Sequence, residues 1–289
     1  MTFLLPIERD TSTGRARIGF IGFGAIAREA VVLLTAMRPR TECMALVRDP
    51  ARAAAPANVR LVTTVEELLQ AEPHVIAETA GHEAVSALVP LIAAHGVPVV
   101  IASVGALADP AVMQALIDSG AAAQNRIYIP AGAVGGLDYL RALRGVPDAT
   151  VIYVSRKPPA AWESDLKIRG IDPHALAEEC VLFEGTAREA ATKFPRNLNV
   201  AMTIALAGVG VERTMVRVVA DPRARGNTHE VIAQSALGSA ELRFTNFASP
   251  SNSRTSLVTA HSIVLSIHEA LQAGSSVAAV NRTCRSQHS

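Results

Sequence analysis

The chain has 289 residues, of which 49% are hydrophobic and 18% are charged, and its formal net charge is +1. This length allows one large core with a second lobe, or two domains, and the near-neutral charge excludes a whole-protein field that would attract nucleic acid or an anionic membrane. The three cysteines, Cys43, Cys180 and Cys284, are far apart and form no CxxC pair, so we expect no disulfide framework and no zinc site, but a reducing, cytoplasmic setting.

The N-terminal part of the chain predicts no targeting or membrane segment. MTFLLPIERDTSTGR lacks a basic start followed by a long apolar run and a cleavage site. The most apolar region, residues 84–107, is interrupted by Pro90 and Pro98 before it reaches the ~18 residues of a spanning helix. We therefore expect a soluble protein whose partners are small molecules, with no nucleic acid and no membrane among them.

From residue 16 to residue 130, short β-branched runs alternate with helical patterns. This rhythm is typical of a parallel sheet wound with helices. Local signals agree, because Thr64 and Glu67 have the spacing of a capping box before a short helix. We predict an α/β fold in which residues 1–133 form a Rossmann domain, a doubly wound parallel sheet that binds a dinucleotide.

A glycine-rich turn follows the first expected strand. GFGAIA places Gly22, Gly24 and Ala27 in a G-x-G-x-x-A arrangement that opens a helix. Gly22 permits a tight turn, Gly24 lets a pyrophosphate approach the backbone, and Ala27 lets the helix pack closely on the strand. Ala25 and Ile26 begin the helix, whose unpaired N–H groups attract an anion. A glycine turn without a ligand is the alternative, but the strand and helix around it favour dinucleotide binding.

Further cofactor positions are expected where the following strands end. The second strand ends in LVRDP, about 20 residues beyond the glycine turn, where Asp49 could bind ribose hydroxyls and Arg48 could stack on adenine or pair with a 2′-phosphate. NAD and NADP therefore both remain possible. Four small or polar residues follow later strands at the edge where a dinucleotide crosses: Thr79, Ala80, Ser103 and Gly105.

After residue 133 the pattern changes to longer strands with one-sided alternation of polar and apolar residues. Helices from about residue 173 to residue 207 are expected to cover the buried face. Residues 134–254 thus predict a second, mixed α/β domain with a largely antiparallel sheet. We expect this domain to be catalytic and to form a homodimer through its exposed sheet face, while a C-terminal helix, residues 255–289, completes the first domain.

Two polar residues of the second half allow two interpretations each. In KFPRNLNVAMT, Asn197 and Asn199 open a helix, and the residues alone slightly favour helix capping over hydrogen bonds to a cofactor or substrate. In ADPRARGNTHEV, His229 follows a glycine-containing turn, either as a strand-entry residue that bonds a turn carbonyl or as a proton-transfer group. An ordinary histidine pKa near ~6.5 suits acid–base catalysis.

The order of segments along the chain resembles the L-aspartate dehydrogenase family from about Arg17 to Leu271. The segments are GFGAIA, PAGAVGGLD, FEGTAREA, FPRNLNVA, LAGVG, ADPRARGNTHEV and NSRTSLVTAHS. The resemblance implies NAD(P)-dependent, reversible conversion of L-aspartate to iminosuccinate and then to oxaloacetate and ammonia, with a possible link from iminosuccinate to NAD biosynthesis. It also implies that His229 is the catalytic acid/base and that Ala133 and Asn199 contact the cofactor.

One element departs from the family's pattern. The family often has Asn-Pro-Lys-Thr-Ser where this chain has Asn252-Ser253-Arg254-Thr255-Ser256. We expect Arg254, Thr255 and Ser256 to bind the substrate carboxylates together with Asn199, with the arginine in place of a lysine. No cluster of histidines and carboxylates predicts a metal site. Two other hypotheses are a non-catalytic dinucleotide sensor and a related oxidoreductase, similar to dihydrodipicolinate reductase or homoserine dehydrogenase, that acts on another small acid.

Overall fold

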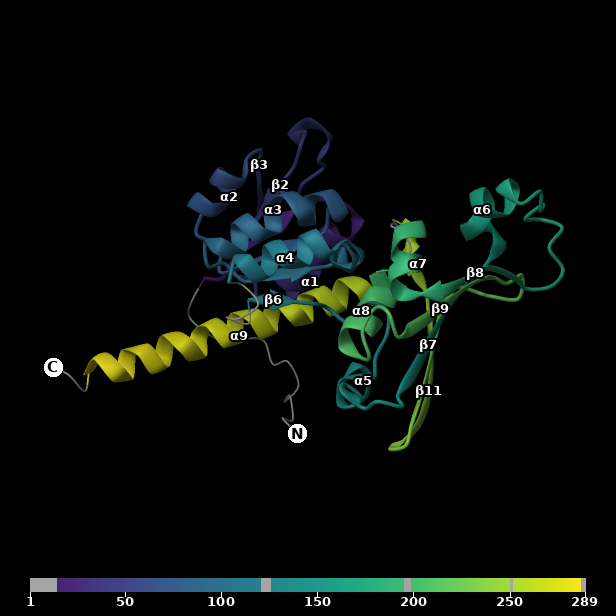
Figure 1. Ribbon diagram of the computed structural model, residues 1–289. Helices are drawn as coiled ribbons and strands as arrows, with labels where there is room; N and C mark the ends of the chain where they lie inside the picture. The colour runs from purple at the N-terminus through teal and green to yellow at the C-terminus, as the bar shows by residue number, and fades with distance from the viewer. Residues whose placement is uncertain (1–14, 121–125, 195–198, 250–251, 287–289) are drawn as a thin grey trace. The chain divides into compact units, whose positions relative to one another are not determined.

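The computed structural model describes residues 15–120, 126–194, 199–249 and 252–286 (Figure 1). Within these ranges the chain divides into two compact units. The first falls within Met1–Ala102, Gln114–Pro130 and Ile263–Ser289, and the second within Ser103–Met113 and Ala131–Ser262. The segment Ser103–Met113, which the sequence analysis assigned to the dinucleotide-binding domain, thus groups with the second unit.

The first unit is built on a parallel sheet of six strands in the order β3-β2-β1-β4-β5-β6. The strands are β1 (Arg17–Ile21), β2 (Glu42–Leu46), β3 (Val59–Val62), β4 (Val75–Glu78), β5 (Val99–Ile101) and β6 (Ile127–Tyr128). The order reverses beside β1, which is the switch point of a Rossmann sheet, where ligands bind at the carboxyl ends of the strands. The predicted Rossmann fold is confirmed.

Short helices connect these strands. They are α1 (Ala25–Met37), the 3₁₀ helix η1 (Pro50–Arg52), α2 (Val65–Gln70), α3 (His82–Ala94) and α4 (Pro110–Asp118). The predicted capping box is present, because Thr64 accepts a hydrogen bond from the Glu67 backbone N–H while the Glu67 side chain accepts from Thr64. Within the described ranges, no helix combines the length and apolar character needed to cross a bilayer.

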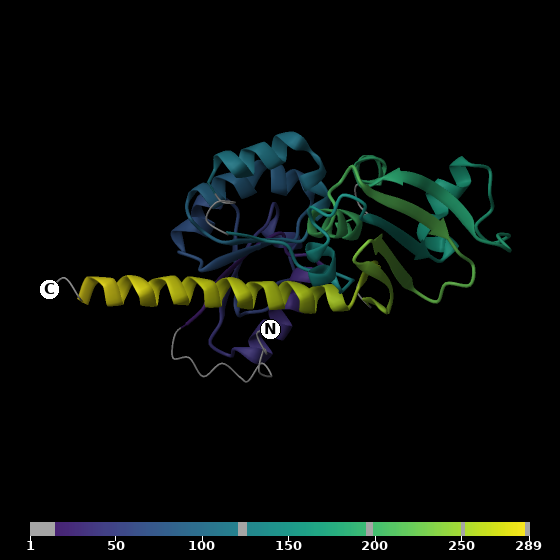
Figure 2. The same cartoon turned by 60° about the horizontal axis from the view of Figure 1, so that its bottom comes forward.

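The last helix, α9 (Val258–Ser286), helps to form the core of the first unit. Ile263, Ile267 and Ala270 are buried there at helical spacing, in the same apolar cluster as Ile18 of β1. Figure 2 shows α9 as one long helix. Residues far apart in sequence therefore share this core.

The chain just before α9 is extended rather than helical. Strand β13 (Asn252–Ser256) pairs with the short strand β12 (Ala248–Ser249). The expected helix start at residue 255 is therefore three residues too early, since Thr255 and Ser256 still belong to β13.

The second unit contains a sheet of five strands in the order β11-β10-β7-β9-β8. Only β7 and β9 run parallel, while the other three neighbouring pairs are antiparallel. The strands are β7 (Thr150–Lys157), β8 (Cys180–Thr186), β9 (Thr214–Ala220), β10 (Asn227–Ser235) and β11 (Gly238–Asn246). The predicted mixed α/β domain with a largely antiparallel sheet is confirmed.

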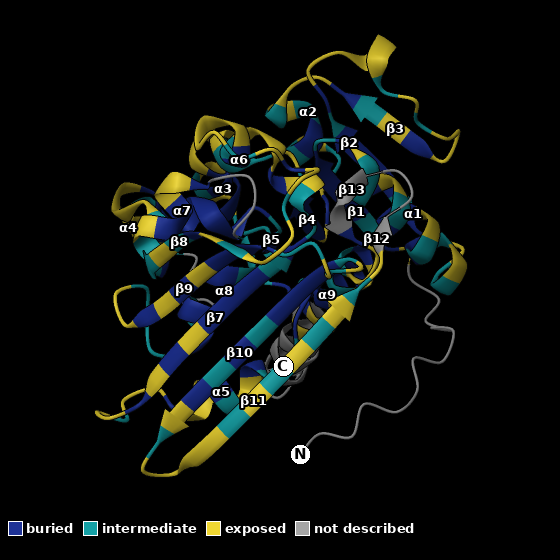
Figure 3. Cartoon of the chain, turned by 90° about the vertical axis from the view of Figure 1, so that its right-hand side faces the viewer, coloured by how far each residue is buried: buried dark blue, intermediate teal, exposed yellow. Residues whose placement is uncertain are grey.

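The two faces of this sheet differ. One face packs against helices, and Val151, Val216 and Val231 are buried in its apolar cluster. The helices of this unit are α5 (Leu137–Ala142), α6 (Glu163–Ile168), α7 (Ala187–Lys193) and α8 (Asn199–Ala207), with the 3₁₀ helices η2 (Val104–Ala108) and η3 (Pro159–Trp162). Figure 3 shows the strands side by side, with buried and exposed residues alternating along β9. The alternation expected for a sheet covered on one side is therefore present.

Part of the expected helical cover is a strand. Helices are expected from about residue 173 to residue 207, whereas β8 lies within that range and pairs with β9. Val181, Leu182 and Phe183 favour a strand because branched and aromatic side chains pack well on a sheet. The helical part begins only at α7, where Thr186 forms a capping box with Glu189.

Candidate active site

The glycine turn of the first unit requires a glycine at position 22. Gly22 has a φ of +82°, and a Cβ atom placed on it would lie 2.9 Å from the Cβ of Ala80. Its backbone N–H donates to the Leu46 carbonyl at 2.9 Å. Both the backbone conformation and the close approach therefore exclude a side chain.

Position 24 is different, because it opens onto free space. Gly24 has a φ of −83°, and no atom lies within 4 Å of a Cβ placed on it. It precedes α1, which has no side-chain cap at its N-terminus. Free space beside unpaired helix N–H groups fits the pyrophosphate of a dinucleotide. Ala25 and Ile26 form the start of this helix, and Ala27 is fully buried against the sheet, as the motif predicts.

The turn after β4 is tied to the glycine turn. The Thr79 hydroxyl donates to the carbonyls of Ile21 at 3.1 Å and Gly22 at 3.3 Å. Glu78, which is 0% exposed, accepts hydrogen bonds at Oε1 from the backbone N–H groups of Ala80 (2.7 Å) and Gly81 (2.8 Å). The structure thus brings together Gly22, Thr79 and Ala80, three residues expected to contact the cofactor. Glu78 was not among the expected site residues, and its only sequence signal is a carboxylate at the end of an apolar strand.

The two residues expected to read the adenosine ribose lie on the surface after β2. Arg48 is exposed, and Asp49 caps η1 by accepting a hydrogen bond from the Ala51 N–H at 3.0 Å. Asp49 also forms an ion pair with Arg52 at 3.3 Å. Asp49 therefore has a local structural role, and this geometry is compatible with either NAD or NADP.

Three of the predicted cofactor residues meet in the second unit. The side-chain carbonyl Oδ1 of Asn199, at the start of α8, accepts a hydrogen bond from the Gly105 N–H at 2.9 Å. Ser103 directly precedes η2 and is buried. The carbonyl oxygen of Asn199 is therefore engaged within the protein, so a ligand would be offered its amide N–H groups.

Ala133 is held separately in the second unit. Its carbonyl accepts a hydrogen bond from Nδ2 of Asn246, at the end of β11, at 2.8 Å. Ala133 is itself buried. Asn246 was not among the expected site residues, since its partner lies 113 positions earlier in the chain.

His229 lies on β10, on the face of the sheet that packs against the helices. It is 5% exposed, and its Nδ1 lies 2.7 Å from the hydroxyl of Tyr153 on β7. Its other ring nitrogen, Nε2, is buried and has no hydrogen-bond partner among the described residues. Burial, followed by the positive charge of Lys157, lowers the pKa of His229 to about 4. The imidazole is therefore neutral at pH 7, with one nitrogen left for a ligand.

Further polar residues lie near His229. Ser155 on β7 is the register partner of His229, and Lys157 follows it by two residues on the same face. Lys157 is 5% exposed, and its Nζ lies 5.3 Å from the ring centre of Trp162. Asn227, two residues before His229, reaches the hydroxyl of Ser256 at 3.5 Å. The buried ammonium of Lys157 lowers the pKa of His229, so a positive charge and a neutral imidazole lie in one polar cluster. No sequence signal marks Tyr153, Lys157 or Asn227 as a neighbour of His229.

The remaining substrate residues are only partly described. Arg254 and Thr255 belong to β13, and their side chains lie outside the described part of the structure. Ser256 is buried, and its contact with Asn227 links it to the strand of His229. Among the described residues, no group of three or more histidines, cysteines or acidic residues could hold a metal ion.

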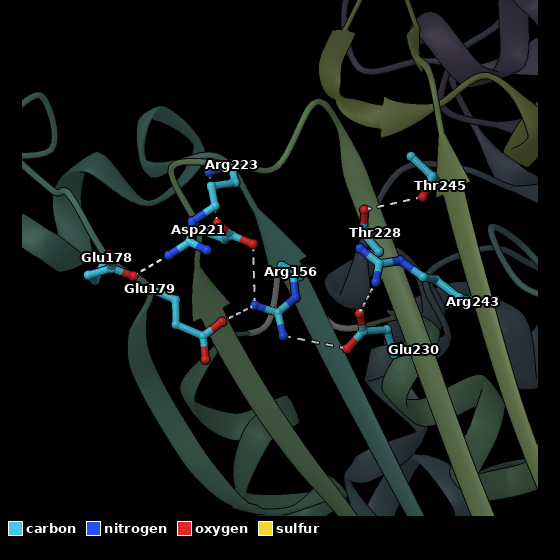
Figure 4. A network of polar contacts seen from close by, with 9 residues as sticks. All are labelled: Arg156, Glu178, Glu179, Asp221, Arg223, Thr228, Glu230, Arg243 and Thr245. Carbon is cyan, nitrogen blue, oxygen red and sulfur yellow. Dashed lines mark hydrogen bonds and ion pairs between the residues drawn. The ribbon is translucent and has the colours of Figure 1, made fainter.

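On the opposite face of the sheet, a network of charged residues braces the strands around His229 (Figure 4). Arg156, only 17% exposed, lies among three carboxylates: Glu179, Asp221 at 3.3 Å and Glu230 at 3.6 Å. Arg243 on β11 also pairs with Glu230, at 3.3 Å. Asp221 begins the turn before β10, and Glu230 directly follows His229. The network therefore contacts the chain on both sides of His229.

A Rossmann unit with a glycine turn, followed by a mixed-sheet unit with a buried neutral histidine, defines an NAD(P)-dependent oxidoreductase. Residues 22–130 match the family model of the NAD binding domain of homoserine dehydrogenase, and residues 138–270 match that of the C-terminal domain of aspartate dehydrogenase. L-aspartate dehydrogenase 2 of Bordetella pertussis is 46% identical over 259 residues, which cover 88% of this chain and 97% of that protein. The chain belongs to the L-aspartate dehydrogenase family.

Other comparisons agree with this assignment. An L-aspartate dehydrogenase of Cupriavidus taiwanensis is 35% identical over 86% of this chain and 94% of its own length. The crystal structure of aspartate dehydrogenase from Thermotoga maritima has a TM-score of 0.67 and 28% identity, and it covers 90% of this chain and 96% of that one. An archaeal homoserine dehydrogenase, at a TM-score of 0.54 and 11% identity, shares the fold alone.

Proposed function

We propose that this protein is an NAD(P)-dependent L-aspartate dehydrogenase. It oxidises L-aspartate to iminosuccinate, which hydrolyses to oxaloacetate and ammonia, and it also runs the reaction in reverse. The observation that carries the proposal is the buried neutral imidazole of His229, whose partnerless Nε2 lies in the same polar cluster as the cation of Lys157. Family membership over most of the chain supports the choice of substrate.

The first unit is proposed to bind the cofactor. Gly24 and the N-terminus of α1, from Ala25 and Ile26, offer N–H groups to the pyrophosphate, and Gly22 shapes the turn. Arg48 or Asp49 would contact the adenosine ribose. The remaining proposed cofactor contacts are Thr79, Ala80, Ser103, Gly105, Ala133 and Asn199. When bound, the nicotinamide supplies the hydride chemistry, so the protein has to orient the substrate and move protons.

His229 is proposed as the acid/base group of the reaction. In the oxidative direction the substrate amine must be neutral before hydride leaves the α-carbon, and the later addition of water and loss of ammonia also move protons. A neutral imidazole can hold or exchange a proton at Nε2. Bound carboxylates raise the pKa of a nearby imidazole, because negative charge favours its protonated form.

The two substrate carboxylates require positive charge and hydroxyl groups. Arg254, Thr255 and Ser256 remain the proposed ligands, together with the amide of Asn199. We add Lys157, because its buried ammonium acts on His229 and offers a carboxylate a charged hydrogen-bond donor. Such recognition favours dicarboxylic over apolar amino acids.

The decisive experiment measures oxidation of NADH and of NADPH by the purified protein with oxaloacetate and ammonium. A reaction without ammonium, a His229→Ala variant and a control His174→Ala variant, which alters an exposed histidine, complete the set. Ammonium-dependent turnover lost only in His229→Ala supports the proposal, and the two coenzymes reveal the preference. Cofactor binding without turnover of any tested acid would instead support the dinucleotide sensor.

A homodimer in the cytoplasm is proposed as the working state. The face of the second sheet that carries Arg156 also exposes Ile152 (40%) and Met215 (39%), which a second copy could cover. Cys43 and Cys180 are free thiols, in keeping with a reducing compartment. Light scattering at micromolar concentration tests the dimer, and a mass of one chain alone would contradict it.

A further inference from the structure

Tyr153 and His229 form a buried pair that the proposed reaction has not yet explained. Tyr153 is 0% exposed, and its hydroxyl lies 2.7 Å from Nδ1 of His229. The two rings are nearly parallel, at 14°, with their centres 6.0 Å apart. A hydrogen bond this short between two buried rings holds the imidazole in one orientation.

The protonation states of Tyr153 and His229 limit the direction of this hydrogen bond. Burial raises the pKa of the Tyr153 phenol and outweighs the opposite effect of the Ser155 hydroxyl, so the phenol keeps its proton. Burial and Lys157 keep His229 neutral. One hydrogen therefore belongs to the phenol and one to the imidazole, and two arrangements remain.

In the first arrangement, the phenol donates to Nδ1 and the imidazole hydrogen lies on Nε2. In the second, Nδ1–H donates to the phenol oxygen, and the phenol hydrogen then needs another acceptor. The only hydrogen bond of normal geometry that the described residues give this hydroxyl is the one to His229, and Ser155 Oγ is itself without such a partner. A buried donor without an acceptor costs more than an unused lone pair. The first arrangement is therefore the more stable one.

We propose that Tyr153 is a positioning residue that donates its hydroxyl hydrogen to Nδ1 of His229 and so holds the imidazole hydrogen on Nε2, the nitrogen presented to the substrate. The resting enzyme then offers the substrate a hydrogen-bond donor. A neutral imidazole N–H of this kind stabilises negative charge that develops on a substrate oxygen or nitrogen.

The pairing with Tyr153 sets the role of the resting imidazole. Nε2 already carries a hydrogen and Nδ1 already accepts from Tyr153, so neutral His229 can donate to the substrate at Nε2 but has no free nitrogen that accepts a proton. The catalytic consequence rests on the proposed function, but the position of the hydrogen does not.

The hydrogen position is measured directly by ¹⁵N NMR of the histidine rings in the cofactor-free, full-length protein at pH 7. A His229→Gln variant assigns the signals among the eight histidines. The proposal expects a pyrrole-type shift for Nε2 and a pyridine-type shift for Nδ1. A pyrrole-type Nδ1 in the unmodified protein would overturn it, and this result requires no enzymatic activity.

A Tyr153→Phe variant removes only the hydroxyl, and Tyr139→Phe, which alters a tyrosine at the edge of the same core, is its matched control. We expect the ring signals of His229 to change in Tyr153→Phe alone, with kcat lowered about tenfold, as for the loss of one hydrogen bond, and KM for aspartate changed less than about twofold. His229 signals unaltered by Tyr153→Phe would refute the positioning role. Absence of aspartate turnover in the unmodified protein would refute the proposed function and leave the NMR result standing.

Discussion

Asn199 accepts a hydrogen bond from the backbone N–H of Gly105, 2.9 Å away, although the two residues are 94 positions apart in the chain. The bond joins the start of α8 to η2 within the second unit. One oxygen of the side chain therefore stabilises the fold, while its nitrogen can serve a ligand. These two roles can be separated experimentally.

The first prediction compares Asn199→Asp with Asn199→Ala. Aspartate keeps an acceptor for Gly105, so we expect its free energy of unfolding to stay close to that of the unmodified protein, whereas alanine should lose about 0.5–1.5 kcal/mol. Both variants lose the amide donor and should bind cofactor or aspartate more weakly. Chemical denaturation and coenzyme titration measure the two effects. Unchanged binding in both variants would confine Asn199 to a structural role.

A second prediction separates the two glycines of the nucleotide turn. Gly22→Ala places a Cβ 2.9 Å from that of Ala80 at a φ of +82° and should destabilise the protein by about 1–3 kcal/mol. Gly24→Ala meets no atom within 4 Å, so the melting temperature should change little. The added methyl group would instead occupy the space proposed for the pyrophosphate, so the coenzyme Kd should rise. Isothermal titration of coenzyme into the Gly24→Ala protein measures this Kd. An unaltered coenzyme affinity would mean that the pyrophosphate binds elsewhere.

The third prediction concerns Lys157. Its replacement by methionine removes a buried cation, so KM for aspartate should rise about tenfold or more, since hydrogen bonds to charged groups contribute about 1.5–3 kcal/mol. The pKa of His229 should rise above about 4, because Lys157 contributes to lowering it. Steady-state kinetics and an NMR titration measure these changes. Lys167→Met, which alters an exposed lysine paired with Glu163, is the control and should change neither.

The fourth prediction is a dependence of stability on pH that originates at His229. Its pKa is about 4 in the folded protein and near ~6.5 in an unfolded chain. Between these values the unfolded state binds more protons, so this contribution to stability is complete above ~6.5 and is lost as the pH falls through about 4. It amounts to about 3 kcal/mol. Tyr153 keeps its proton throughout this range, because burial raises its pKa.

Urea denaturation at pH 7 and pH 4 tests this contribution, with His229→Gln as the comparison. The difference in unfolding free energy between the two proteins should change by about 3 kcal/mol from one pH to the other. A constant difference would mean that His229 titrates normally and is open to water.

The sequence predicted the Rossmann unit well because its signals are local. The glycine turn, the Thr64 capping box and the alternation of strands and helices each depend on residues a few positions apart. The strand β8 differs from the expected helix because its partner residues in β9 lie 29 to 40 positions later, and local residue preferences do not identify that pairing. Pairing between distant strands is set by the whole fold rather than by local preference.

The same distinction explains the candidate site. The order of segments predicts a catalytic role for His229, but Tyr153 lies 76 positions away, and nothing in VIYV indicates a partner for an imidazole. Lys157 and Asn227 lie near His229 because β7 and β10 pair in one register and alternate side chains point to the same face of the sheet. Glu78 was not expected in the site, because its role depends on the fold of the turn that follows it. In that turn the N–H groups of Ala80 and Gly81 donate to its carboxylate.

The contribution of α9 to the first unit affects how the protein can be made. Ile263, Ile267 and Ala270 complete a core whose first strand begins at Arg17, so this core cannot close until nearly the whole chain has left the ribosome. The second unit ends at Ser262, so it can form earlier during synthesis. Until α9 arrives, the nucleotide-binding sheet exposes apolar surface to other nascent chains and to chaperones.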